Sequence, residues 1–392
     1  MKAAVIRFYG VVALSALADM ALLIGLIWAA LRVTGSPLLL GTLLGISALL
    51  PFSIRRAFPT LDSTRLSVRQ VVLLRGGVYG ALLLIALGGL LQTLAGFVVS
   101  AVLVGVLNYM TTSAYEAANT KQVLAGLLDS QRSARWMQTA FQLGAFSGAF
   151  LGGLVLDRAS LGVLVYAVAA LALVTAGVAA VLPADQPPLT PAMRRDASAA
   201  TGGLVDAGGR GVTLLCLALG MIGFHIGAFN TLIPLVYQRL HGWSSADFGL
   251  ASGIAGVGAF LAAILPWPRG RVLLWAGLLV VGDYLLAFSP LPWVSMGICL
   301  LIGFGINTLR IDLRQRMIEA ATTTEQANRL AATSSVYFIF LQSAAPLGVG
   351  LLCSQYAFGP GAAPHVFVGV GGLLLGAVLL TRMHRPRAAL AQ

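Results

Sequence analysis

The chain has 392 residues, of which 58% are hydrophobic and only 10% are charged. Soluble domains carry about a quarter charged residues, so this composition excludes a soluble protein. The net charge of +12 does not require a nucleic acid partner, because basic loops beside an anionic membrane leaflet explain it. We therefore expect a membrane protein that contacts the lipid bilayer and binds no nucleic acid.

Apolar runs recur along the whole chain near the length that crosses a bilayer, about 20 residues. They predict an all-α membrane protein with twelve transmembrane helices, at residues 8–31, 37–54, 71–92, 95–115, 136–156, 160–182, 212–237, 246–266, 272–289, 293–310, 332–353 and 364–381.

The charged loops predict the orientation of these helices. With the N-terminus in the cytoplasm, all but three of the 25 Lys and Arg residues fall on the cytoplasmic side, the exceptions being Arg32, Arg158 and Arg239. This bias follows the positive-inside rule and predicts that both termini are cytoplasmic. The loop charges suggest the inner (plasma) membrane of a bacterium. Every basic residue can be placed at a cytoplasmic or outer helix end, so we expect an interior poor in cations unless Arg75 or Arg310 reaches inward.

The first run, from Val11 to Ala30, holds Asp19 near its middle. A carboxylate at that depth is costly unless it is neutralised, paired or placed in a wet cavity, so it indicates a functional site. We interpret Asp19 as the carrier of a coupling proton. The alternative is a fixed hydrogen-bond acceptor that braces the helix.

Two charged residues lie near predicted cytoplasmic helix ends, Glu116 on the fourth helix and Arg310 on the tenth. We interpret both as gate residues. Snorkelling of long side chains towards the membrane surface explains them equally well.

The fifth helix contains the sequence GAFSGAFLGG at residues 144–153. Glycines four residues apart form a flat stripe that lets another helix approach closely, and they permit bending. Gly144, Gly148, Gly152 and Gly153 are therefore predicted to serve gating and helix packing.

A polar stretch at residues 183–210, with several prolines and glycines, predicts a flexible cytoplasmic linker. It separates an N-terminal six-helix bundle, residues 1–182, from a C-terminal one, residues 211–392.

The C-terminal bundle has two ionisable residues within predicted helices. A neutral imidazole both donates and accepts hydrogen bonds, so His225, midway through the seventh helix, is our second candidate for proton or substrate contact; a satisfied interior histidine is the alternative. For Asp283, late in the ninth helix, we expect a structural role. The three cysteines have no metal-ligand spacing and are interpreted as packing residues. No metal site or cofactor is predicted.

Features of the two bundles recur at a nearly constant separation, which indicates a duplicated six-helix unit. Gly35-Ser36-Pro37, followed by Gly41 and Gly45, corresponds to Gly242-Trp243-Ser244, followed by Gly249 and Gly253. Asn108 corresponds to Asn307, and Gln142 to Gln342. Because the first loop of each unit is predicted outside, the repeats are parallel.

Twelve helices in two parallel halves with a long cytoplasmic linker resemble the major facilitator superfamily over essentially the whole chain. The glycine motif of the fifth helix is similar to that family's antiporter signature, GxxxGPxxGG, with Ala149 in place of proline. This resemblance implies an exporter that is usually a monomer. The segment Ser15-Ala16-Leu17-Ala18-Asp19 most resembles the enterobactin-exporter-like and drug-efflux branch. The loop at residues 51–59 departs from the family pattern, because its arginines remain while its glycines and aspartate are missing.

Several amides recur on the helices that would line a central cavity. Gln138 and Gln142 are one turn apart and share a helix face. We interpret them, with Gln342, Asn108 and Asn307, as groups that bind a polar, uncharged part of a substrate. Hydrogen bonds between helices are the alternative.

Together these features predict a secondary transporter and not an enzyme, since no nucleophile–base pair, metal motif or nucleotide-binding loop is present. The leading hypothesis is proton-coupled export of a small amphipathic molecule, such as a drug, siderophore or secondary metabolite, by alternating access. An importer of an iron chelate or nutrient and a lipid flippase are the alternatives. The expected partners are the small-molecule substrate and protons.

Overall fold

The structure is a computed structural model that describes residues 3–57, 66–124, 128, 130–180, 210–265, 271–320 and 324–383. All of the regular elements in these ranges are helical. The predicted linker lies outside the described residues, except for Arg210, where a helix begins.

The first six long helices and the short helix between α3 and α4 match the first six predicted segments. They are α1 Ala3–Thr34, α2 Pro37–Ala57, α3 Val68–Leu87, η2 Leu90–Gln92, α4 Leu94–Leu124, α5 Ser130–Arg158 and α6 Leu161–Ala180.

The later helices match the remaining predicted segments. They are α8 Arg210–Leu235, the π-helical turn η4 Val236–Leu240, α9 Ser245–Ile264, α10 Val272–Phe288, α11 Pro292–Ala320, α12 Thr324–Leu352, η5 Pro360–Ala362 and α13 Ala363–Met383. Several of them continue beyond the predicted apolar runs, because a helix does not have to end where its residues become polar.

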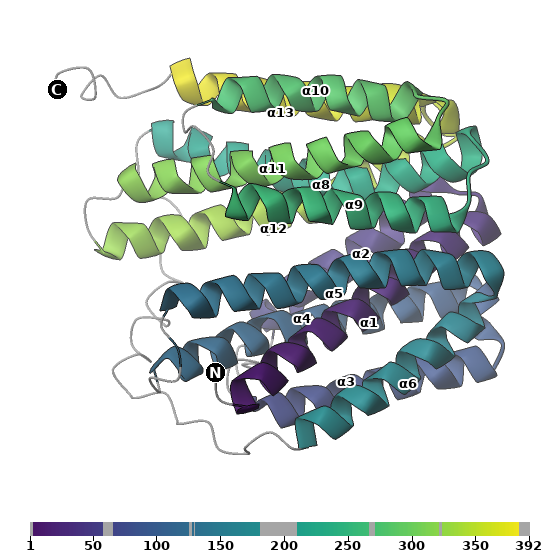
Figure 1. The fold of residues 1–392 in the computed structure, drawn as a ribbon. Coiled ribbons are helices and arrows are strands. Elements are labelled where there is room, and N and C mark those ends of the chain that lie inside the picture. Colours follow the sequence, from purple (N-terminus) through teal and green to yellow (C-terminus); the bar gives the residue numbers. More distant parts are fainter. Residues whose placement is uncertain are drawn as a thin grey trace.

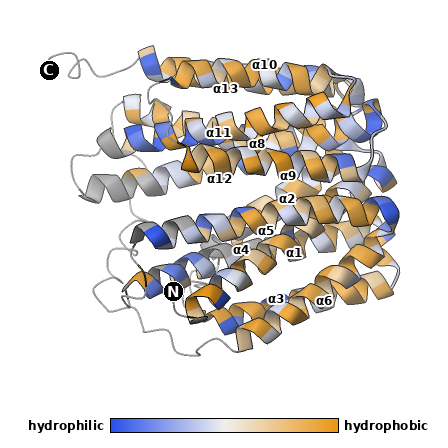
Figure 2. Cartoon of the chain, viewed as in Figure 1, coloured by the Kyte–Doolittle hydropathy of each residue, from blue (hydrophilic) through white to orange (hydrophobic). Residues whose placement is uncertain are grey.

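Nine helices within the described residues are long and apolar enough to cross a membrane, judged by length and composition. Three further helices contain shorter apolar stretches, at Pro37–Leu50, Leu94–Leu107 and Val272–Phe288. Figure 2 shows hydrophobic residues along the length of the helices and hydrophilic residues mainly near their ends. This distribution is the one expected of a bundle whose middle lies in lipid.

The helices lie roughly side by side in one bundle (Figure 1). α3 packs against α6 at one edge and α10 packs against α13 at the opposite edge. Contacts of α5 with α9 and of α2 with α12 join the first six helices to the last six. The other long helices lie between these two edges.

The repeated sequence around Gly35 and Gly242 has a local structural reason. Both glycines have positive φ angles, 64° and 67°, a conformation that glycine adopts without steric cost. Gly35 follows α1 and Gly242 follows η4. The Ser36 hydroxyl then accepts a hydrogen bond from the Leu39 amide at 3.3 Å, and the Ser244 hydroxyl accepts one from the Asp247 amide at 3.1 Å. Each motif thus ends one helix and caps the next.

The three cysteines, Cys216, Cys299 and Cys353, are buried and free. Their interpretation as packing residues is confirmed, since they lie in the apolar core.

Candidate functional site

Asp19 on α1 forms a two-point ion pair with Arg75 on α3. The Arg75 nitrogens Nη1 and Nη2 donate to Asp19 Oδ2 and Oδ1 at 2.8 and 2.7 Å. The Arg75 side chain is 3% exposed and the Asp19 side chain is 22% exposed. A guanidinium that contacts both carboxylate oxygens gives a strong, directional, charge-assisted interaction.

Further polar groups complete this ion pair. Arg75 also donates to the Thr111 hydroxyl at 2.9 Å and to the Ser15 carbonyl oxygen at 3.1 Å. The Tyr79 hydroxyl, one turn from Arg75 on α3, donates to Asp19 Oδ1. Asp19 is therefore a paired carboxylate, and its charge is balanced by a residue far away in the sequence.

Arg75 reaches inward and is the exception to the expected shortage of cations in the interior. α3 begins at Val68, so Arg75 lies two turns inside the helix and not at its end. Burial of its guanidinium is possible because Asp19 supplies the opposite charge. This partnership could not be predicted from local sequence, because the two residues are 56 positions apart on different helices.

A second buried pair joins α8 to α10. His225 Nε2 lies 3.0 and 2.9 Å from the two carboxylate oxygens of Asp283. The two side chains are 1% and 0% exposed. His225 is thus paired with Asp283, a partner that the sequence analysis did not predict, and its role in proton or substrate contact stays a prediction.

The glycine stripe of α5 lets another helix approach closely, and the structure identifies that helix as α1. A Cβ atom at Gly144 would collide with the Ala13 carbonyl oxygen, and one at Gly148 would collide with the Leu17 carbonyl oxygen. At Gly152 the nearest atoms belong to Ala21. The absence of side chains at these positions lets the two helix backbones touch.

Gly153 lies on another face of α5, at the contact between the first six and the last six helices. A Cβ at Gly249 on α9 would lie 3.0 Å from the Gly153 Cα atom. On the opposite side of the bundle, a Cβ at Gly350 on α12 would lie 3.3 Å from the Gly41 Cα atom. Close backbone contact therefore joins α5 to α9 and α2 to α12.

Polar and aromatic contacts close one end of the bundle, where α1 ends at Thr34 and α9 begins at Ser245; we call it the tight end. Gln238 Nε2 donates to the Trp28 carbonyl oxygen and Arg239 Nη2 donates to the Leu31 carbonyl oxygen, both at 3.2 Å. The Trp28 and Phe248 rings stack with centroids 5.8 Å apart. The cationic Arg239 thus caps the C-terminus of α1, where the helix dipole favours positive charge.

Opposite charges also meet between α4 and α11, towards the other end. Glu116 is exposed and lies within electrostatic reach of Arg310 and Arg314. The Arg310 Cζ atom lies 4.8 Å from the centre of the Phe338 ring on α12. Arg310 therefore reaches between helices, and its predicted role in a gate stays a prediction.

The structure describes the side chains of four of the five predicted amides. Gln138 is exposed and Gln142 half-buried on α5, and Gln342 is half-buried on α12. Asn307 Nδ2 donates to the Ala259 carbonyl oxygen at 2.6 Å and so joins α11 to α9. The Asn108 side chain lies outside the described residues.

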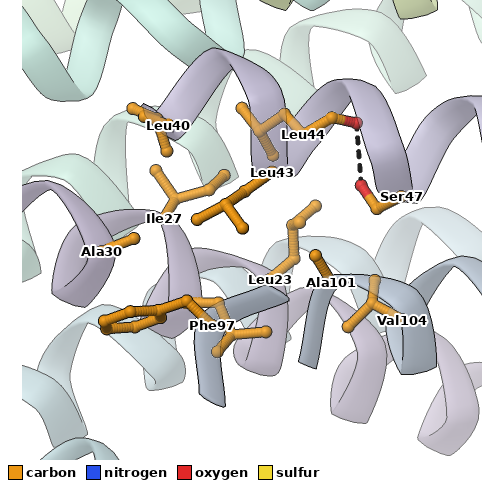
Figure 3. Close-up of a pocket in the computed structure, with 11 residues that line it drawn as sticks. Leu23, Ile27, Ala30, Leu40, Leu43, Leu44, Ser47, Phe97, Ala101 and Val104 are labelled. Atoms are coloured by element: carbon orange, nitrogen blue, oxygen red, sulfur yellow. Dashed lines mark hydrogen bonds between the residues drawn. The ribbon is translucent and has the colours of Figure 1, made fainter. Parts of the chain in front are cut away.

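An apolar pocket lies between α1, α2 and α4 (Figure 3). It has a cavity volume of about 30 Å³ and is lined by Leu23, Leu26, Ile27, Ala30, Leu40, Leu43, Leu44, Ser47, Phe97, Ala101 and Val104. Its hydroxyl-bearing residue, Ser47, donates to the Leu44 carbonyl oxygen at 2.9 Å. Leu23 is one helical turn from Asp19, so the pocket begins close to the ion pair along α1.

No group of three His, Cys, Asp or Glu residues that could hold a metal ion occurs in the described part of the chain.

Known proteins with similar structures are transporters. The crystal structure of the nucleoside transporter NupG matches 98% of this chain and 100% of its own, with a TM-score of 0.72 and 11% identity. The human organic anion transporter MFSD10 matches 96% of this chain and 100% of its own, with a TM-score of 0.59 and 19% identity. At these identities the likeness shows a shared fold.

The sequence itself is similar to an uncharacterised MFS-type transporter of Pseudomonas aeruginosa, found in two strains. The two chains are 29% identical over 178 residues, which is 43% of this chain and 42% of the relative. The fold and this relative support the MFS-type transporter family. No family model matches the chain.

An MFS-type transporter is a multi-pass membrane protein that moves a substrate and is not an enzyme. The resemblance to the major facilitator superfamily, abbreviated MFS, is thus supported. These similarities do not test whether the chain belongs to the enterobactin-exporter-like branch, so that assignment stays a prediction.

Proposed function

We propose that this MFS-type chain exports a small amphipathic molecule in exchange for protons by alternating access. The observation that carries the proposal is the Asp19–Arg75 pair, which joins α1 to α3 inside an apolar bundle. Ionisable residues at such depth usually mark substrate or ion pathways. The partial exposure of Asp19 supports contact with water or substrate on one side.

The proposal includes twelve membrane spans arranged as two six-helix bundles, residues 1–182 and 211–392, joined by a cytoplasmic linker at 183–210. Matching edge pairs, α3 with α6 and α10 with α13, support the two bundles. The charge bias of the loops supports cytoplasmic termini and a bacterial inner membrane. We take the functional unit to be a monomer.

The substrate is proposed to have an apolar body and a polar, largely uncharged part. The half-buried amides of Gln142 and Gln342 suit the polar part, and the pocket beside Leu23 suits one small apolar group of the substrate. Arg310, placed over Phe338, adds a position for one negative charge. Since the fold is shared with a nucleoside transporter and an organic anion transporter, both classes join drugs and siderophores as substrates to test.

Two residues are proposed to carry the coupling proton, Asp19 and His225. Proton binding at Asp19 requires that the carboxylate lose the donated hydrogen bonds of Arg75. Substrate contact near α1 or α3 would provide such a change. Proton binding at His225 requires that water reach a site that is buried in this structure.

Export is the proposed direction because the α5 glycine stripe resembles the antiporter signature, and that stripe packs on α1. An importer is the first alternative, and accumulation of substrate in right-side-out vesicles would favour it. A lipid flippase is the second, and transport without a steep dependence on protons would favour it.

The decisive experiment measures proton release from the purified, detergent-solubilised protein after addition of siderophores, lipophilic drugs, nucleosides and organic anions. The wild type is compared with Asp19→Asn. Release that is lost in the variant while substrate binding is retained would support antiport through Asp19. Substrate binding without proton release in either protein would exclude proton exchange and favour facilitated diffusion or lipid transport.

A further inference from the structure

The two buried ion pairs occupy equivalent places in the repeated unit. Asp19 and Arg75 join the first and third helices of the N-terminal set, and His225 and Asp283 join the first and third helices of the C-terminal set. His225 is 206 residues after Asp19, and Asp283 is 208 residues after Arg75. The other repeated features are separated by 199 to 208 residues, so both separations fit the same duplication.

The charges are exchanged between the two pairs. In the N-terminal set the first helix carries the acid and the third carries the base, whereas in the C-terminal set the first helix carries the base and the third carries the acid. In both sets the side chains bridge helices whose backbones have few close contacts with each other. Each pair is therefore the main polar link between its two helices.

The pairs differ in their proton chemistry. Arginine stays protonated throughout the physiological range, so the Asp19–Arg75 pair is neutral without binding a further proton. Histidine and aspartate both titrate, and His225 with Asp283 is neutral only when the two share one proton. Apolar surroundings disfavour net charge, so this pair holds its proton while it is sealed.

Among the described residues, the His225–Asp283 pair is surrounded by an aromatic ring, a glycine and a thiol. The Phe367 ring on α13 lies 5.3 Å from the His225 ring, and a Cβ at Gly371 would collide with Asp283 Oδ2. Cys299 on α11, a buried thiol, lies within electrostatic range of Asp283. Neither α12 nor α13 places a charged side chain in a hydrogen bond or ion pair with the two residues within the described parts of the chain.

Of the two candidate carriers of the coupling proton, we propose that His225 is the one that binds it, with Asp283 as its partner, and that the Asp19–Arg75 pair keeps its protonation state throughout. In the closed site His225 is an imidazolium that donates through Nε2 to the Asp283 carboxylate. When a conformational change admits water, the imidazolium transfers its proton to water and leaves a neutral imidazole beside the carboxylate. Rebinding from the opposite side restores the pair. This assignment rests on the proposed function and gives Asp283 a role in it.

The site is tested without any substrate, by recording ¹⁵N-histidine NMR spectra of the full-length protein in detergent across a pH series. The His225 signals are assigned by their loss in His225→Gln. We expect imidazolium at His225 in the wild type and in Asp19→Asn. In Asp283→Asn the imidazolium should disappear at a lower pH, because its carboxylate partner is gone. Neutral imidazole at His225 throughout the series, or spectra unchanged by Asp283→Asn, would overturn the proposal.

The exchanged variant His225→Asp/Asp283→His is a second test that stays valid if the single variants misfold. It keeps one acid and one base on the same two helices, so an imidazolium on α10 supports the pair as the proton site. A histidine that is neutral in the exchanged variant at every pH overturns it.

Substrate-driven proton release then separates this proposal from the proposed function. Release that is lost in Asp283→Asn and kept in Asp19→Asn supports the assignment, and release that is kept in Asp283→Asn overturns it as the coupling site. Absence of release from the wild type with every substrate, beside a normal His225 titration, would overturn proton exchange as the function while leaving a proton-binding pair.

Discussion

Arg75 and Asp19 depend on each other, because each would otherwise be a lone charge in apolar surroundings. We predict that Arg75→Gln lowers the free energy of unfolding by roughly 3 kcal/mol, the lower part of the range for broken buried pairs, because 22% of the Asp19 side chain is exposed. Thermal unfolding in detergent measures the change. The double variant Asp19→Asn/Arg75→Gln should recover part of the loss, and a single variant as stable as the wild type would contradict the pairing.

The sequence located Asp19 and His225 by one criterion, an ionisable residue inside an apolar run. That criterion missed Arg75, since its position near the start of the third run suggested a helix end, and the structure places it two turns inside α3. For Asp283, late in a predicted helix, the sequence analysis expected only a structural role. An alignment of the two repeats at a separation of about 207 residues would have placed the two pairs at equivalent positions, if ionisable residues of either charge had been compared.

At the scale of helices, the α5 glycines set how closely α5 approaches α1. We predict that Gly148→Ala destabilises the protein by about 1 to 3 kcal/mol, because the added methyl group collides with the backbone of Leu17 and forces the helices apart. Thermal unfolding measures this as well. Gly177→Ala on α6 is the matched control, because no atom lies within 4 Å of its added methyl group.

The control should be neutral or slightly stabilising, since alanine favours a helix interior by up to about 1 kcal/mol over glycine. Equal effects of the two substitutions would mean that the α1–α5 contact does not limit stability.

Helix positions and the α5 glycine stripe could be predicted because apolar length and glycine spacing are local properties of the sequence. The partners of the helices could not, since contacts of α5 with α9 and of α2 with α12 depend on three-dimensional packing. The pairing of Gly153 with Gly249 shows the difference: both glycines were noticed, one as part of the stripe and one as part of the repeat, but nothing local placed them together. The number of membrane spans stays a prediction, because within the described residues nine helices are long and apolar enough to cross a membrane and three more have only short apolar stretches.

At the scale of the whole molecule, the tight end holds the two helix sets together through a few replaceable contacts. Gln238 and Arg239 bind carbonyl groups at the end of α1, and Ser245 Oγ donates to the Gly153 carbonyl oxygen at 3.1 Å. Alternating access requires such contacts to break when this end opens. Side-chain bonds to carbonyl groups suit that need, because water can replace them at small net cost.

We therefore predict that Arg239→Gln shifts the conformational equilibrium towards opening of the tight end, because it removes the cation that caps α1. Spin labels at Leu90→Cys and Trp293→Cys, both exposed and on different helix sets, report the separation by pulsed electron paramagnetic resonance. The native cysteines are buried, which limits labelling elsewhere.

Arg239→Gln should broaden the distance distribution towards longer values. Arg158→Gln, which removes an exposed cation at the end of α5, is the matched control and should leave it unchanged. Identical distributions for the two variants would mean that Arg239 does not help to hold the tight end closed.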